Sequence, residues 1–253
     1  MLTYIKVRLK PHWGFMLNMF TFTKSRPSLR IIPPTTLIGA LAYPLNLNDS
    51  EMIENFSSAE KIRDMFVSVN QALSLPLTEH NDLSRIVWYR EREKTLKTDA
   101  VAIGKLYSAC GFLTNIFIVD NFRAEKILGK DWLKDLVSSA WSITRVGSKE
   151  SIVSVEDVEY GPTSEIDSQN RVVTTRFYFP IDAVESDSIT GNYITATVVD
   201  WRCTKIGDYK LGKRVPIIVP YDWIGKKETK VQVKVKEGYK VFNIRGDIIV
   251  SWK

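Results

Sequence analysis

Alternation of apolar and polar side chains predicts the first element, a strand over residues 3–10. Ile5, Val7 and Leu9 fall on one face, and the other face carries Tyr4, Lys6, Arg8 and Lys10. A period of two is typical of a half-buried strand, here with a basic outer face. Residues 13–22 predict a second extended, aromatic-rich piece.

Apolar residues at helical spacing predict three helices. The first covers residues 37–42 and is expected to end near Pro44. The second covers residues 58–75, where the apolar positions are Ile62, Met65, Phe66, Val69, Ala72 and Leu73. The third covers residues 123–141, and Gly129 is expected to interrupt it.

Two further apolar or alternating stretches predict a long hairpin. Residues 85–96 place Trp88, Arg90, Arg92 and Lys94 on one side of a strand, and residues 112–120 form a strongly apolar strand. The polar residues 97–105, bounded by Lys97 and Lys105, are expected to form its projecting tip. A basic face with a tryptophan suits nucleic acid, because cations meet phosphate and the ring can stack on a base. A ladder of Arg–Glu pairs on a solvated sheet is the alternative.

With a strand over residues 152–160, the order is strand, helix, strand, strand, helix, strand. This order predicts an α+β fold, with a ferredoxin-like βαββαβ domain over residues 1–160, the fold also used by RNA recognition motifs. The aromatic signature of those motifs is absent, so the fold does not establish RNA binding. After a polar linker at 162–170, short strands separated by turns predict a smaller β-rich domain over residues 161–253.

Charge is distributed unevenly along the 253 residues, whose net charge is +6. Residues 1–48 hold six Lys or Arg and no Asp or Glu, since Asp49 is the first acid. Residues 201–253 hold 13 basic and 5 acidic side chains, whereas residues 49–200 hold 16 basic and 24 acidic side chains. Both ends of the chain are therefore expected to share a surface that faces a polyanion, unless these cations only form a solvated face.

Several chemistries lack their sequence signatures. The two cysteines, Cys110 and Cys203, form no metal-binding motif, and no phosphate-loop, dinucleotide-binding, zinc-protease or serine-hydrolase motif is present. No metal or cofactor is expected. The alternating, charged N-terminus is unlike a signal peptide, and no apolar run nears the roughly 20 residues of a membrane span, so we expect a cytoplasmic protein.

Residues 24–45 contain the first candidate phosphate site. Arg26 and Arg30 precede Pro33 and Pro34, and Thr35 and Thr36 open an apolar helix that has no carboxylate in its first turn. A helix N-terminus with arginines upstream suits a phosphate. A capped core helix with merely solvated arginines explains the same pattern.

A second candidate phosphate site is the glycine turn at residues 145–151. Gly147, between Arg145 and Lys149, predicts a tight loop whose amide groups and two cations hold an anion. A connection from helix to strand in which glycine caps the helix is the alternative.

Two segments resemble a known family. Residues 30–41, RIIPPTTLIGAL, resemble the N-terminal motif of the CRISPR-associated "Cas five" proteins, and residues 146–158, VGSKESIVSVEDV, resemble the Gly-x-Lys segment before the last strand of their first domain. The size and order of elements agree along the chain, most closely with the archaeal type I-A branch.

The resemblance implies a RAMP fold with a thumb hairpin, here at about residues 88–111, and a smaller β domain. It implies an antiviral CRISPR function as the Cascade subunit that caps the 5′ handle of crRNA and contacts a backbone subunit and the large subunit. The RNA-binding residues would be Arg26, Arg30, Thr35, Thr36, Trp88, Arg90, Arg92, Lys94, Lys97, Lys105, Arg145 and Lys149.

Whether the chain cleaves RNA is a separate question. One branch of the family processes precursor crRNA with histidine, tyrosine and lysine, but no such set is recognisable here, so we expect a non-catalytic binder. The alternative is a metal-independent endoribonuclease that uses His12 with a nearby tyrosine and lysine. A further alternative is a purely structural assembly subunit.

Overall fold

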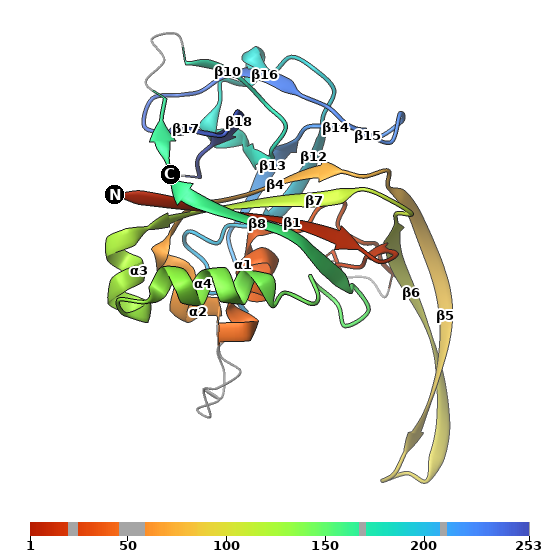
Figure 1. Cartoon of the computed structure of the whole chain (residues 1–253). Helices are drawn as coiled ribbons and strands as arrows, with labels where there is room; N and C mark the ends of the chain where they lie inside the picture. Colours follow the sequence, from red (N-terminus) through yellow and green to blue (C-terminus); the bar gives the residue numbers. More distant parts are fainter. Residues whose placement is uncertain (20–24, 46–58, 167–170, 208–211, 253) are drawn as a thin grey trace.

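The computed structural model describes residues 1–19, 25–45, 59–166, 171–207 and 212–252. At its centre is an antiparallel sheet in the order β4-β7-β1-β8. The strands are β1 (Leu2–Pro11), β4 (Phe66–Ser74), β7 (Phe112–Asp120) and β8 (Val153–Pro162). With helices after β1 and after β7, this order is the predicted ferredoxin-like arrangement (Figure 1).

Helices cover one face of this sheet (Figure 1). They are α1 (Pro34–Leu45), the short α2 (Ala59–Ile62) with the 3-10 turn η1 (Arg63–Met65), α3 (Asn121–Leu128) and α4 (Trp132–Trp141). The apolar side of β1, with Ile5 and Val7, shares a buried cluster with Leu37 and Leu41 of α1. The predicted break between α3 and α4 at Gly129 is confirmed, since this residue has a φ of 88°.

The predicted helix over residues 58–75 is wrong beyond its first turns. From Phe66 to Ser74 the chain forms β4, which pairs with β7. Strand β4 is buried on both faces, so it lacks the alternation of a half-buried strand, and its apolar positions imitate a helical period. Its polar residues Asn70 and Gln71 are fully buried and hydrogen-bonded.

A long two-stranded ribbon projects from the body (Figure 1). It consists of β5 (Thr78–Arg90) and β6 (Thr95–Tyr107), paired so that Trp88 lies opposite Lys97 and Arg90 opposite Thr95. The ribbon thus begins ahead of the predicted residue 88. The predicted tip at 97–105 is wrong, because those residues lie within β6 and the turn is at 91–94. This turn contains no glycine or proline; Lys94 takes a φ of 48° instead.

Short strands support the base of the ribbon. β2 (Gly14–Phe15) and β3 (Ser25–Arg26) both pair with β6. Only two residues of the predicted extended piece at 13–22 are therefore strand, and residues 20–22 lie outside the described residues.

The C-terminal part consists of short strands in small sheets, as predicted. These elements are β9 (Ser164–Glu165), β10 (Val172–Thr175), β11 (Phe179–Pro180), η2 (Ile181–Ala183), η3 (Ser186–Ser188), β12 (Ile194–Val199), β13 (Arg214–Val219), β14 (Tyr221–Asp222), β15 (Lys227–Glu228), β16 (Val231–Lys234), β17 (Val241–Ile244) and β18 (Asp247–Val250). The sheets are β10-β16, β11-β13-β12, β14-β15 and β18-β17-β9.

This C-terminal part packs on the face of the central sheet that the helices leave open (Figure 1). Tyr4 and Ile118 share a buried cluster there with Phe177 and Phe242. The predicted basic outer face of β1 is therefore only partly correct. Tyr4 is buried, and the ammonium of Lys6 lies 3.1 Å from a carboxylate oxygen of Asp247. Only Arg8 and Lys10 on that face are exposed.

Buried hydrogen bonds also join the two parts. The side-chain amide of Asn70 in β4 donates to the carbonyl oxygens of Tyr178, at 2.7 Å, and Val250, at 3.1 Å. The Ser68 hydroxyl in turn donates to Asn70 and accepts from the amide of Trp252. A fully paired polar network of this kind fixes one arrangement of the packed layers, because any other would leave buried polar groups unsatisfied.

Candidate nucleic-acid interface

The N-terminus of α1 begins as the sequence indicates, with one difference. Pro34 is the first helical residue, and the carbonyl oxygen of Pro33 accepts from the amides of Thr36, at 3.0 Å, and Leu37, at 3.1 Å. Thr35 and Thr36 therefore lie inside the first turn rather than capping it. No acidic side chain occupies this turn, so the positive end of the helix dipole is uncompensated by the helix's own residues.

The glycine turn lies beside this helix end. Gly147 has a φ of 97°, and a Cβ atom there would lie 2.6 Å from a methyl carbon of Leu17. Ser148 donates its amide hydrogen to the carbonyl oxygen of Met16 at 3.3 Å. Helix α4 ends earlier, at Trp141 with Ser142 as its cap, so the alternative in which Gly147 caps the helix is wrong.

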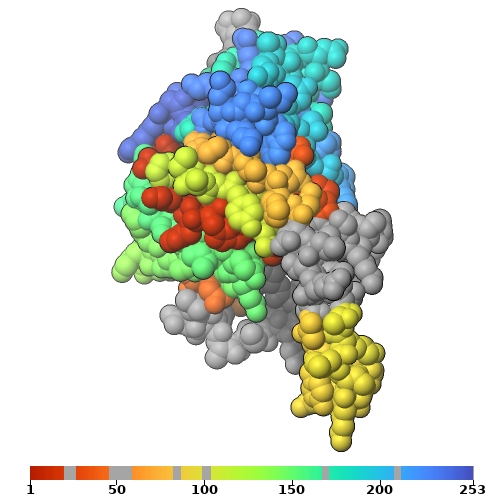
Figure 2. All heavy atoms as spheres, turned by 90° about the vertical axis from the view of Figure 1, so that its right-hand side faces the viewer, coloured from red at the N-terminus to blue at the C-terminus, as the bar shows by residue number. Residues whose placement is uncertain are grey.

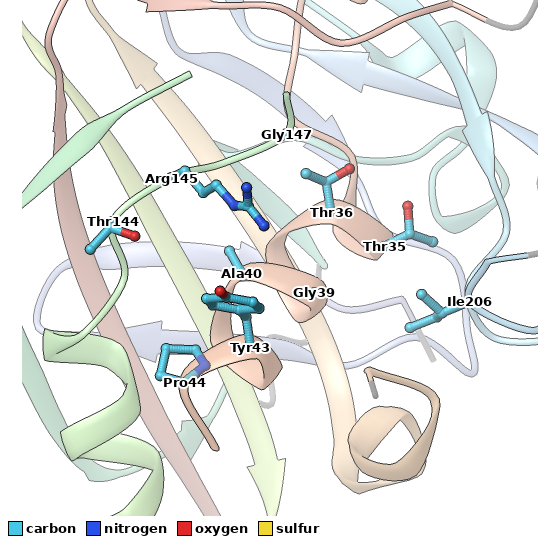
Figure 3. Close-up of a pocket in the computed structure, with 10 residues that line it drawn as sticks. All are labelled: Thr35, Thr36, Gly39, Ala40, Tyr43, Pro44, Thr144, Arg145, Gly147 and Ile206. Carbon is cyan, nitrogen blue, oxygen red and sulfur yellow. The ribbon is translucent and has the colours of Figure 1, made fainter. Parts of the chain in front are cut away.

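The two predicted phosphate motifs form one cavity of about 240 Å³ (Figure 3). Its lining residues are Thr35, Thr36, Gly39, Ala40, Tyr43, Pro44, Thr144, Arg145, Gly147 and Ile206. The Arg145 side chain extends from the glycine turn toward α1 (Figure 3), and its guanidinium lies 5.1 Å from the ring centre of Tyr43. Lys149 is exposed on the same turn. The arrangement combines a cation, two hydroxyl groups and a helix N-terminus, which together suit an anion.

Arg30 lies on the other side of the same helix end, but it has partners within the chain. Its guanidinium donates to a Glu79 carboxylate oxygen at 2.9 Å and lies 4.0 Å from the ring centre of Trp223. The Arg30 side chain is nevertheless 41% exposed. An RNA phosphate would therefore compete with Glu79 for this cation.

Arg26 is the second residue of β3, and its backbone lies opposite Ile103 of β6. Lys24 lies outside the described residues. The structure thus places the backbone of Arg26 at the base of the ribbon, several residues before the turn that leads to α1.

The six predicted RNA-binding residues of the hairpin lie along the ribbon, whose far end stands clear of the body (Figure 2). Glu93 in the turn pairs with Arg90 and, at 2.7 Å, with Lys97. The predicted alternative of Arg–Glu pairing therefore applies in part. Arg92 and Lys94 are exposed in the turn, and Trp88 is 39% exposed. Lys105 lies nearer the base, opposite His80.

The endoribonuclease alternative names His12, whereas the chain's other histidine, His80, lies near a tyrosine and a lysine at the base of the ribbon. The ring of His12 hydrogen-bonds to the Ser154 hydroxyl at 2.8 Å. The ring of His80, by contrast, lies 6.0 Å from that of Tyr107, centre to centre. Lys105 pairs with His80 across the strands, so all three side chains lie on one face of the ribbon. Sequence spacing could not show this grouping, because strand register brings residues 80 and 105 together.

Two contributors to the interface were missed in the sequence. The Tyr43 ring lies 5.1 Å from the Arg145 guanidinium, and residues 195–199 of β12 line a second cavity together with Thr35 and Thr36. No local signal marks either, since both contacts depend on packing between distant segments. In the described residues no group of three or more His, Cys, Asp or Glu side chains is placed to bind a metal ion. No helix of the described part is long and apolar enough to cross a membrane.

The fold has a solved counterpart. The structure is similar to the crystal structure of a CRISPR protein from Archaeoglobus fulgidus, with a TM-score of 0.66, 20% identity and coverage of 100% of both chains. This likeness shows that the two chains share one fold along their whole length. No protein-family model matches the chain.

Two relatives match nearly the whole chain. The chain is 29% identical over 247 residues to "CRISPR system aCascade subunit Cas5 1" of Saccharolobus solfataricus, which covers 94% of this chain and 96% of the relative. It is 27% identical over 245 residues to "CRISPR-associated protein Cas5 3" of the same organism, with the same coverage. The chain is thus similar over nearly its whole length to Cas5, or "Cas five", proteins. The resemblance seen in residues 30–41 and 146–158 is confirmed.

Proposed function

We propose that this protein is a cytoplasmic Cascade subunit of the Cas5 family, of the type I-A branch, and that it binds and caps the 5′ handle of crRNA without cleaving it. The observation that carries the proposal is the convergence of the two family-like segments on one cavity. Gly147 of the second segment lines this cavity together with Thr35 and Thr36 of the first, and the side chain of Arg145, the residue just before the second segment, extends toward α1. Neither segment alone makes a site, whereas together they supply cationic and hydroxyl groups for a handle phosphate.

The ribbon extends the proposed interface away from the body. Arg92 and Lys94 supply charge for RNA phosphates, and Trp88 supplies a ring on which a base can stack. The other side of the ribbon exposes Tyr89 and Leu96, which lie opposite each other. An apolar side suits the contact with a neighbouring backbone subunit, while the large subunit would bind the body.

The test is binding of handle RNA in EDTA over a range of salt concentrations. The probe is an RNA whose 5′ end is the repeat-derived handle from the CRISPR arrays of the same genome. We expect Arg145→Ala to weaken binding about 10-fold and to lower the salt slope by about 0.7, as one phosphate contact is lost. The matched control is Lys130→Ala, which removes an exposed cation outside this cavity. Equal effects of the two variants would contradict a site at Arg145.

One observation favours a second candidate function, a metal-independent endoribonuclease. His80, Lys105 and Tyr107 share one face of the ribbon base, and these residue types can transfer protons in RNA cleavage. Incubation with repeat RNA in EDTA separates the two functions. Specific cleavage that is lost in His80→Ala or His12→Ala would replace the binder with a nuclease. If RNA binding is absent but assembly with the other Cascade subunits is intact, a purely structural role is supported instead.

A further inference from the structure

A second, larger cavity of about 700 Å³ adjoins the cavity that Arg145 lines. Thr35 and Thr36 line both cavities, so the first turn of α1 is their shared wall. Arg30 and Arg214 line the larger cavity, together with Glu79, the partner of Arg30. Its volume is within the range of about 300–1,000 Å³ that is typical of small-molecule sites, whereas the smaller cavity is below that range. The smaller cavity is therefore suited to a phosphate group and the larger one to a base.

The far wall of the larger cavity is the edge of a strand. All five residues from Thr195 to Val199 of β12 line it. Successive side chains of a strand point to opposite faces, so only an edge can present five consecutive residues to one cavity. Strand β12 is the last strand of its sheet, and among the described residues it pairs with β13 alone.

The register of β12 shows which of its backbone groups face the cavity. Thr197 lies opposite Pro216, which has no N–H group, and the amide of Asp200 donates to the carbonyl oxygen of Lys213 at 2.8 Å. Hydrogen-bonded pairs alternate with non-hydrogen-bonded pairs in an antiparallel ladder, so Thr197 belongs to a non-hydrogen-bonded pair. Its N–H and C=O groups therefore point away from β13, as do those of Thr195 and Val199.

We propose that this cavity binds one unstacked nucleobase of the RNA strand, and that the free edge of β12 hydrogen-bonds to the base through the backbone of Thr197. The proposal deepens the proposed function and rests on it. Three observations favour a nucleotide over an extended peptide. The cavity adjoins the proposed phosphate site across the first turn of α1, arginines line it, and it is large enough to enclose a ring. Single-stranded RNA is commonly recognised by hydrogen bonds to splayed-out bases.

Photo-crosslinking tests the location of the base. The probes are handle RNAs that carry 4-thiouridine at one position at a time. Trypsin cleaves after Arg176 and Arg202, and residues 177–202 contain no other Lys or Arg, so one peptide reports on β12. We expect one handle position to crosslink to this peptide. If the RNA binds and every crosslink maps to other peptides, this inference is overturned while the proposed function stands.

A pair of substitutions at Thr197 tests the hydrogen bond. Thr197→Pro removes the outward N–H group, and Thr197→Ala keeps it while removing the same side chain. We expect Thr197→Pro to weaken binding of the handle RNA about 2- to 10-fold, and Thr197→Ala to bind as the wild type does. The loss should disappear for an RNA that is abasic at the crosslinked position. A loss of the same size with the abasic RNA would overturn the inference.

Hydrogen exchange gives a readout on the unaltered protein. Handle RNA should slow exchange of the Thr195, Thr197 and Val199 amides. If a protein subunit slows these amides and the RNA does not, the edge binds a protein strand and the base-binding inference is overturned. If the wild-type chain binds no handle RNA, either alone or in its complex, the proposed function fails and this inference fails with it.

Discussion

The hydroxyl of Tyr178 donates a hydrogen bond to the carbonyl oxygen of Ile32, 3.3 Å away. The amide of Ile32 in turn donates to the side-chain oxygen of Gln71 at 3.2 Å, and Gln71 accepts the amide hydrogen of Tyr178 on its own carbonyl oxygen at 3.0 Å. A residue of the C-terminal part and a residue of β4 thus hold both backbone groups of Ile32. Because α1 begins two residues later, its N-terminus is fixed by segments far away in the chain.

The first prediction concerns stability at alkaline pH. Burial raises the pKa of Tyr178 well above its ordinary value of 10.0. Above about pH 10 the unfolded chain loses this proton while the folded chain keeps it, so the free energy of unfolding falls as pH rises, by about 1.4 kcal/mol per pH unit from this group. Tyr178→Phe should remove that contribution, as measured by urea unfolding between pH 9 and pH 11. Equal slopes for the variant and the wild type would contradict the burial of this hydroxyl.

The second prediction concerns the glycine turn at Gly147. A Cβ atom at Gly147 would approach Leu17, whereas one at Gly129, which has a similar φ of 88°, has nothing within 4 Å. Gly129→Ala therefore measures the backbone strain alone, about 1–3 kcal/mol. We expect Gly147→Ala to lower the free energy of unfolding by about 1–3 kcal/mol more, because Leu17 must move. Urea unfolding of both variants tests this. Equal losses of unfolding free energy would show that the turn can change its conformation without displacing Leu17.

The third prediction concerns Glu93 at the end of the ribbon. Glu93 pairs with both Arg90 and Lys97. Glu93→Gln should free both cations, so that handle RNA binds more tightly and with a steeper salt dependence. The control is Glu91→Gln, which makes the same charge change in the same turn. If the two variants strengthen binding equally, the effect comes from net charge and not from the released cations.

The sequence predicted the elements in which apolar and polar side chains alternate or recur with a regular period. Ile5 and Val7 of β1 alternate with polar residues. The apolar residues that predicted α1 are the ones that pack this helix on the sheet. Strand β4 was missed because both of its faces are buried, which removes the alternation and buries Asn70 and Gln71. The ribbon turn was misplaced because residues 91–94 are charged and lack glycine and proline.

The candidate site was predictable to a smaller degree. Composition and local motifs singled out Arg145 and the start of α1, and the resemblance suggested that they act together. Their contact, however, depends on how the loop at Gly147 packs against Leu17. The pairing of Arg30 with Glu79 and the grouping of His80 with Tyr107 depend on the register and placement of β5. Neither the register nor the placement of β5 can be predicted from the residues near it in the sequence.

The ribbon has a thermodynamic consequence for assembly. Its base is supported by β2 and β3, but between Arg85 and Ala100 each strand pairs, within the described part of the chain, only with the other. Because an isolated two-stranded ribbon is marginally stable in water, this outer half can fray without unfolding the body. A partner that binds this outer half must also order it, so part of the binding free energy is used to order the two strands. The affinity of such a partner should therefore depend on temperature and on the intrinsic strand propensity of residues 85–100.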